Sequence, residues 1–236
     1  METSLYAVFG LGLIFGLNHA LDPDHLIAVS TIVSEHKNLK WASLIGAFWG
    51  LGHTFTLFVV GFLVLGMKLT IPVKAGEGLE FLVAIMLVFL GARVLWRSFQ
   101  REMAHLHAHV HNPQTHAHFH VHGSVEEDHG HIHAFKAMRR PFLVGMVHGL
   151  AGSAALMLLV LATIPSALAG LMYIVIFGVG SIGGMLILST MIGLPFILTA
   201  QRFTLLNRWI RLAAGAMSVL FGLYLGWKIA SEMGLI

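Results

Sequence analysis

Apolar residues fall into six long runs that short polar stretches separate. A bilayer core roughly 30 Å thick takes about 20 apolar helical residues, and each run is long enough to cross it. The pattern therefore predicts an all-α polytopic membrane protein with six transmembrane helices. These helices are expected at Leu5–Val33, Trp41–Met67, Glu80–Phe99, Pro141–Ile164, Leu168–Leu198 and Trp209–Ala230.

The first run is too long for one straight membrane helix. At about 1.5 Å per residue, Leu5–Val33 would extend about 43 Å. Pro23 lies inside this run. A proline within a helix removes one backbone hydrogen bond and clashes with the carbonyl four residues earlier, here that of His19. We predict that the helix breaks at Pro23.

Composition supports the membrane assignment and narrows the chemistry. Hydrophobic residues make up 57% of the 236 residues and charged residues 11%, which excludes a soluble globular domain. The chain has no cysteine, so disulfides, thiolate metal sites and iron–sulfur clusters are excluded. The net charge of +3 comes from basic residues between the apolar runs, which suits membrane topology. A lipid bilayer is expected around the chain, and no nucleic acid as a partner.

The basic residues also predict an orientation, because Lys and Arg favour the cytoplasmic side of a membrane. With six spans, eleven of the fourteen fall on one face and three on the other. We therefore expect both termini outside the cytoplasm and the long loop after the third span inside it. The larger set is Lys37, Lys40, Arg93, Arg97, Arg101, Lys136, Arg139, Arg140, Arg202, Arg208 and Arg211, and the smaller is Lys68, Lys74 and Lys228.

The two halves of the chain share sequence patterns in the same order. Gly16–Leu21 has the pattern Gly-x-x-His-x-Leu, which recurs at Gly145–Leu150, and Val88–Trp96 resembles Val219–Trp227. Because each half has three spans, the halves must face opposite ways, as in secondary transporters with inverted repeats. The alternative is chance similarity between Gly- and Leu-rich helices. The expected division is residues 1–100, a loop at 101–139, and residues 140–236.

Polar side chains concentrate within the first apolar run. His19, Asp22, Asp24 and His25 lie within seven residues, and a charge at the bilayer centre costs at least a few kcal/mol. A break at Pro23 would bring these residues together. Imidazole and carboxylate ligands suit nickel, cobalt or zinc better than calcium or magnesium. The alternative is an N-cap at Asp22 with hydrogen-bonded histidines at a membrane surface.

Two further histidines lie in later spans. His53 is in the glycine-containing stretch Gly50–Thr54 and is a candidate fourth ligand, although a lone buried histidine is more often a hydrogen-bonding residue. His148 takes the place in the second half that His19 has in the first, but no carboxylate follows it. We expect His148 to line the pathway or support a single metal site in the first half. Asn18 and Ser181 are weaker candidates for the polar wall.

The loop between the third and fourth spans holds eleven of the sixteen histidines. Its composition predicts a disordered, metal-binding segment. Three roles fit, namely buffering ions before export, capturing them after import, and sensing their concentration. A solvated linker is the alternative. The histidines are His105, His107, His109, His111, His116, His118, His120, His122, His129, His131 and His133.

The pattern His19-x4-Asp24-His25, followed by Leu-Gly-His-Thr at 51–54, resembles the nickel/cobalt transporter family, which includes urease-accessory nickel transporters and nickel/cobalt exporters. The resemblance implies a secondary transporter of nickel or cobalt ions with no prosthetic group. It implies that His19, Asp24 and His25 form the metal site needed for transport, and we add His53 as a further metal ligand. It also implies the bacterial inner membrane, with metal chaperones or a second copy of the chain as candidate partners.

Two differences from the family leave the direction of transport open. Many members have eight spans rather than six, and the His-rich loop is more similar to exporters or the urease-accessory branch. Two other functions remain: an amino-acid-exporter-like carrier in which the histidines relay protons, and a metal sensor or urease-assembly factor in which only the loop binds ions. The sequence has no Walker-type phosphate loop and no catalytic triad arrangement, so no enzyme is expected.

Overall fold

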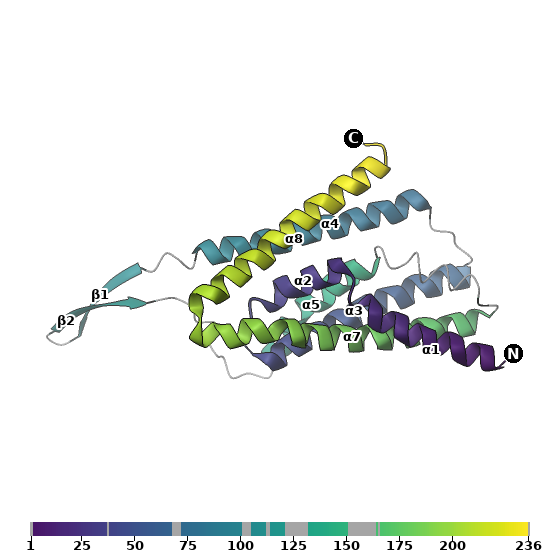
Figure 1. Ribbon diagram of the computed structural model, residues 1–236, viewed down its shortest axis with the longest axis horizontal. Helices are drawn as coiled ribbons and strands as arrows, with labels where there is room; N and C mark the ends of the chain where they lie inside the picture. The colour runs from purple at the N-terminus through teal and green to yellow at the C-terminus, as the bar shows by residue number, and fades with distance from the viewer. Residues whose placement is uncertain are drawn as a thin grey trace.

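The computed structural model describes residues 2–36, 38–67, 72–100, 105–111, 114–120, 132–150, 164 and 166–235. Within this part the chain forms seven helices and one two-stranded sheet (Figure 1). In order they are α1 (Glu2–His19), α2 (Pro23–Val33), α3 (Leu39–Met67), α4 (Val73–Gln100), β1 (His105–His111), β2 (Gln114–His120), α5 (Ile132–Leu150), α7 (Ala167–Arg202) and α8 (Thr204–Glu232).

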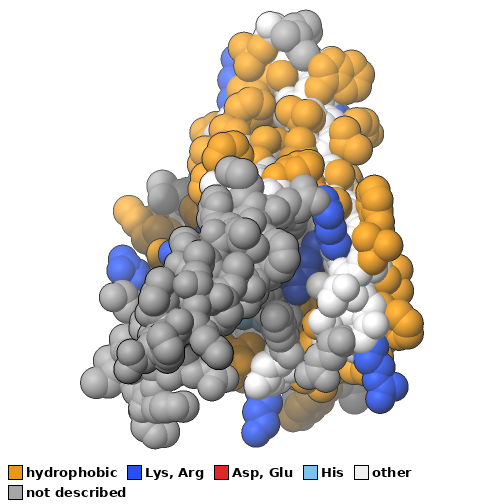
Figure 2. Space-filling view, turned by 90° about the vertical axis from the view of Figure 1, so that its left-hand side faces the viewer, with side chains coloured by type: hydrophobic (Ala, Val, Ile, Leu, Met, Phe, Trp, Pro, Cys, Tyr) orange, Lys and Arg blue, Asp and Glu red, His pale blue; other side chains and the backbone are white. Residues whose placement is uncertain are grey.

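Four of these helices, α3, α4, α7 and α8, are long and apolar enough to cross a membrane. They cover the second, third, fifth and sixth predicted runs. The shorter α1 and α2 cover the first run, and α5 covers the start of the fourth, whose remainder at 151–163 lies outside the described residues. Large apolar side chains such as Trp96 and Trp227 are 67% and 62% exposed, and Figure 2 shows hydrophobic side chains over the upper part of its view. Lipid, rather than water, suits such a surface.

The predicted break in the first run is confirmed. Helix α1 ends at His19 and α2 begins at Pro23, with a turn in which the Leu21 amide donates to the Asn18 carbonyl at 2.8 Å. Asp22 has φ −59° and ψ 141°, the extended conformation favoured before proline. Pro23 itself starts the next helix, where its missing N–H is tolerated. The break therefore consists of the three residues between His19 and Pro23.

The helices pack in two groups. Figure 1 shows α1, α3, α5 and α7 in one group and α4 beside α8 in another, with the short α2 between them. Contacts run between α3 and α7, α3 and α5, α1 and α7, and α4 and α8, while α2 contacts helices of both groups. The buried core around α2 includes Val29, Ile45, Trp49 and Met185. Helix α2 is thus enclosed by protein on several sides.

Glycines allow close backbone contact at matching places in the two halves. A Cβ added to Gly180 in α7 would collide with the carbonyl oxygen of Leu13 in α1. A Cβ added to Gly52 in α3 would likewise collide with the carbonyl oxygen of Phe142 in α5. Phe142 lies 129 positions after Leu13, and Gly180 lies 128 after Gly52. Small residues therefore permit close helix packing in both halves.

Helices α4 and α8 repeat this relation within their own pair. A Cβ on Gly91 would lie 2.8 Å from the amide nitrogen of Val219, and one on Gly222 would lie 2.9 Å from that of Val88. Gly222 lies 131 positions after Gly91, and Val219 lies 131 positions after Val88. The two ends of this helix pair therefore contact each other in the same way.

The loop contains structure that its composition did not predict. Strands β1 and β2 pair antiparallel, with His107 opposite His118 and His109 opposite His116. The prediction of disorder is wrong for these residues, because histidine alternates there with other residues in the period-two pattern of a strand. Of the other loop histidines, His133 lies in α5, and His122, His129 and His131 lie outside the described residues.

Candidate metal site

The break between α1 and α2 is the centre of a histidine cluster. His19 is the last residue of α1, and Asp24 and His25 lie in the first turn of α2. His53 comes from the middle of α3, and His148 from the last turn of α5. The structure thus places all four sequence-predicted site residues together and adds His148 from the second half of the chain.

Three of the histidines form one potential metal-binding group. His19, His25 and His53 each offer a ligand atom within 4.8 Å of the others. The Nε2 atoms of His19 and His53 are 3.2 Å apart. Metal–nitrogen bonds of about 2.0–2.1 Å in tetrahedral or octahedral geometry separate two such nitrogens by about 2.9–3.4 Å. The spacing therefore fits two imidazoles that share one ion.

A second potential group consists of Asp24, His25 and His148. One carboxylate oxygen of Asp24 lies 3.2 Å from His25 Nδ1, and the other lies 2.9 Å from His148 Nε2. The rings of His25 and His148 are 4.1 Å apart at their centres. Asp24 is therefore placed with His25 and His148, and is linked to the first group through the ring of His25.

Asp22 also contacts the cluster. It occupies the N-cap position of α2, but its side chain makes no capping hydrogen bond. Instead its Oδ2 lies 2.7 Å from Nδ1 of His19. A carboxylate on one ring nitrogen orients the imidazole and leaves the other nitrogen for a metal. The N-cap explanation from the sequence thus holds for the backbone position of Asp22 and not for its carboxylate.

Several polar atoms in and near the cluster are buried without a hydrogen-bond partner in the described part of the chain. They are His25 Nε2, His53 Nδ1, His148 Nδ1, Trp49 Nε1 and Ser181 Oγ. The side chains of His25 and His53 are 1% and 0% exposed. Buried polar atoms are usually paired, because an unpaired one costs roughly 1–3 kcal/mol. Free nitrogens on buried imidazoles are therefore what a metal-binding site would present.

Two neighbours of the cluster were not candidates from the sequence. The ring of Trp49 lies 6.0 Å from that of His25 and 5.6 Å from that of His148, and Phe177 lies 5.6 Å from His19. Aromatic residues are common in apolar helices, so no local signal singled them out. Of the weaker candidates, Ser181 is fully buried, whereas Asn18 is exposed at the end of α1.

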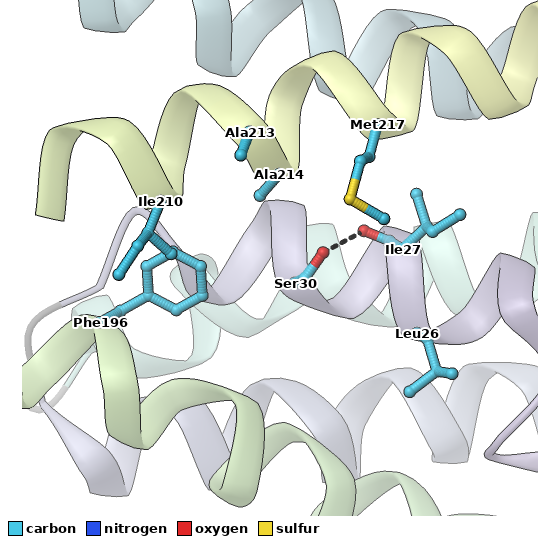
Figure 3. A pocket seen from close by; sticks show the side chains of 8 residues that line it. All are labelled: Leu26, Ile27, Ser30, Phe196, Ile210, Ala213, Ala214 and Met217. Atoms are coloured by element: carbon cyan, nitrogen blue, oxygen red, sulfur yellow. Dashed lines mark hydrogen bonds between the residues drawn. The ribbon is translucent and has the colours of Figure 1, made fainter. Parts of the chain in front are cut away.

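An apolar cavity of about 300 Å³ lies on the other side of α2, against α7 and α8 (Figure 3). Its only hydroxyl-bearing residue, Ser30, donates to the carbonyl of Ile27 at 2.8 Å. The cavity offers an ion no free polar ligand. Its lining is Leu26, Ile27, Ser30, Phe196, Ile210, Ala213, Ala214 and Met217.

A charged group follows the end of α2. Glu35 lies 2.8 Å from Arg97 and 3.7 Å from Arg93, so the segment after α2 is tied to α4. Burial lowers the pKa of the neighbouring His36, because it disfavours the charged imidazolium. These ion pairs anchor the far end of the helix whose first turn holds Asp24 and His25.

Comparison with known proteins agrees with this chemistry. The family described as "High-affinity nickel-transport protein" (NicO) matches residues 5–229. The chain is 38% identical over 239 residues to the urease accessory protein UreH of Bacillus sp. (strain TB-90), covering 99% of this chain and 96% of that protein. No solved structure matches the chain. The resemblance drawn from the His-x4-Asp-His pattern is confirmed, and a transporter rather than an enzyme is indicated: this integral membrane chain belongs to the NicO family of nickel-transport proteins.

Proposed function

We propose that this chain is a secondary transporter that moves nickel, and also cobalt, through an intramembrane site at His19, Asp24, His25 and His53. The observation that carries the proposal is the convergence of these residues at a helix break within a chain of a nickel-transport family. The ion is the substrate, and no prosthetic group takes part.

The ligand chemistry supports nickel and cobalt. Imidazole nitrogens and one carboxylate suit late first-row divalent ions, and the chain has no cysteine that could supply a thiolate ligand. The Nε2 atoms of His19 and His53 are already at the spacing of two ligands on one ion.

We also propose six spans arranged as two inverted three-helix repeats. The support is the set of equivalent contacts, in which Gly180 against Leu13 corresponds to Gly52 against Phe142. In this arrangement α1 and α2 make the first span, and α5 with the residues that follow it makes the fourth. The units remain residues 1–100 and 140–236, with the His-rich loop at 101–139 between them.

The proposed orientation places the loop in the cytoplasm of a bacterial cell. Figure 2 shows Lys and Arg side chains around the end of the molecule from which the hairpin of β1 and β2 extends. Lys40, Arg97, Arg139 and Arg202 are exposed near helix ends on this side. Cytoplasmic faces are enriched in such residues. The relative named as a urease accessory protein favours uptake, with the ion passed to an assembling enzyme or a metal chaperone.

The test is flux of radioactive nickel into proteoliposomes of known orientation, with and without a pH gradient. We expect saturable flux in the unchanged chain and none in His25→Ala, because His25 lies in both metal-binding groups. His36→Ala is the matched control, since it removes a histidine outside the cluster. Unchanged nickel flux in His25→Ala would contradict the proposal, and amino-acid flux in its place would favour the other carrier hypothesis.

A further inference from the structure

His25 lies between the two metal-binding groups and belongs to both. Its ring centre is 4.5 Å from that of His19 and 4.1 Å from that of His148. Its Nδ1 faces the Asp24 carboxylate at 3.2 Å, whereas its Nε2 is buried without a hydrogen-bond partner in the described residues. The two nitrogens of one ring are therefore available to different neighbours.

We propose that Asp24, His25 and His148 form a second position for the transported ion, next to the position at His19, His25 and His53. The inference rests on the proposed transport function and extends it to a residue of the second half of the chain. An ion that passes between the positions stays beside the ring of His25 but moves from its Nε2 to its Nδ1, while the ring's proton moves from Nδ1 to Nε2. The ion exchanges His19 and His53 for Asp24 and His148.

The geometry of the second group suits an ion. Asp24 Oδ2 and His148 Nε2 are 2.9 Å apart, and Asp24 Oδ1 and His25 Nδ1 are 3.2 Å apart. Ligand atoms bound at about 2.0–2.2 Å lie at such separations from one another. Two imidazoles and a carboxylate also form a ligand set that divalent transition metals use with open positions.

The burial of the groups gives the two positions different surroundings. His53 in the first group is fully buried, and His148 in the second is 3% exposed. The Asp24 side chain, in contrast, is 29% exposed. The second position thus combines a carboxylate with partial access, whereas the first consists of three imidazoles, of which those of His25 and His53 are buried. A dication would enter or leave through the second position more easily than through the first.

The shared ring also limits occupancy. A neutral imidazole carries a proton on one nitrogen and a lone pair on the other, so it binds one ion at a time. The two positions are therefore successive steps for a single ion, and they do not form a two-metal centre. His148, which stands where His19 stands in the other half, thereby gains a function that its sequence position alone did not define.

A plainer alternative is that His148 only donates a hydrogen bond to Asp24. Binding of Co²⁺ to the full-length chain in detergent separates the two explanations. We compare H19A/H53A, which lacks two ligands of the first position, with H19A/H53A/H148A. Because the His-rich loop is identical in both, the triple variant gives the loop's background. We expect the double variant to bind one Co²⁺ per chain more than the triple variant, with absorption bands that the triple variant lacks.

Equal Co²⁺ binding by folded double and triple variants would overturn the proposal. Gel filtration and thermal unfolding check folding, and a single variant provides a test that does not need the double change. In H148Q we expect Co²⁺ to bind at the first position nearly as in the unchanged chain, while nickel flux falls by about tenfold or more because the ion loses a ligand of its second position. Unchanged flux in H148Q overturns the second position and leaves the proposed function standing, whereas absence of flux in the unchanged chain refutes the proposed function itself.

Discussion

The contact between α3 and α5 predicts a specific effect of one methyl group. In Gly52→Ala the new Cβ would lie 2.9 Å from the carbonyl carbon of Phe142 and would collide with its oxygen. Carbon atoms in contact prefer about 3.5–4.0 Å, so α5 must move from α3 by roughly 1 Å. Overpacking of this kind costs about 1–3 kcal/mol. His148 lies on the displaced helix, so the site is disturbed as well.

The same helix offers a matched control in Gly66, where an added Cβ meets nothing within 4 Å. Gly66→Ala keeps all contacts and gains up to about 1 kcal/mol from the higher helix propensity of alanine. Because Gly52→Ala gains the same helix propensity, the two variants differ only by the overpacking cost of about 1–3 kcal/mol. The difference reflects only what surrounds each glycine.

The assay is the equilibrium between folded and unfolded chain in mixed micelles with increasing denaturing detergent, followed by tryptophan fluorescence. Nickel flux in proteoliposomes of the same samples reports the site. We expect Gly52→Ala to unfold at lower denaturant and to transport more slowly than Gly66→Ala. Equal unfolding midpoints for the two variants would refute the close approach of α3 and α5.

Three further changes test the site and its supports. Asp22→Asn removes the carboxylate that lies 2.7 Å from His19 Nδ1. We expect the nickel affinity measured by titration to fall about 10–100-fold. An unchanged affinity would contradict the orienting role of this contact. Glu35→Gln removes the ion-pair partner of Arg97. Because the pair is partly exposed, we expect the free energy of unfolding to fall by at most about 1 kcal/mol. A fall of more than about 3 kcal/mol would contradict this minor role. Deleting Leu106–Ile132 should lower the number of bound ions but retain flux, and a complete loss of flux would contradict an auxiliary loop.

Local chemistry made the helix break predictable. Proline lacks an N–H and restricts the residue before it, so Pro23 and Asp22 determine the break wherever the surrounding helices lie. The candidate ligands His19, Asp24 and His25 are close in sequence, so a break between them was enough to suggest a common site. The alternation of His105–His111 has the period of a strand, but the composition of the loop led us to predict disorder there.

The contacts of each carboxylate could not be read from the chain. Asp22 and Asp24 are two residues apart, yet one contacts His19 and the other contacts His25 and His148. Their positions depend on the direction in which the turn leaves α1 and on the packing of α5 against α3. The contact between Asp24 and His148 joins residues 124 positions apart, for which no local pattern exists.

The sequence alone determined a membrane chain of apolar helices, the break at Pro23, the histidines and carboxylates beside it, and the repeat that relates His148 to His19. These features follow from side-chain hydropathy and backbone stereochemistry, which act locally. Only the tertiary structure decided that His53 and His148 approach the ring of His25 from different helices. The physical reason is close packing: glycines let α1, α3, α5 and α7 approach at their backbones, and that approach sets the distances between the imidazoles.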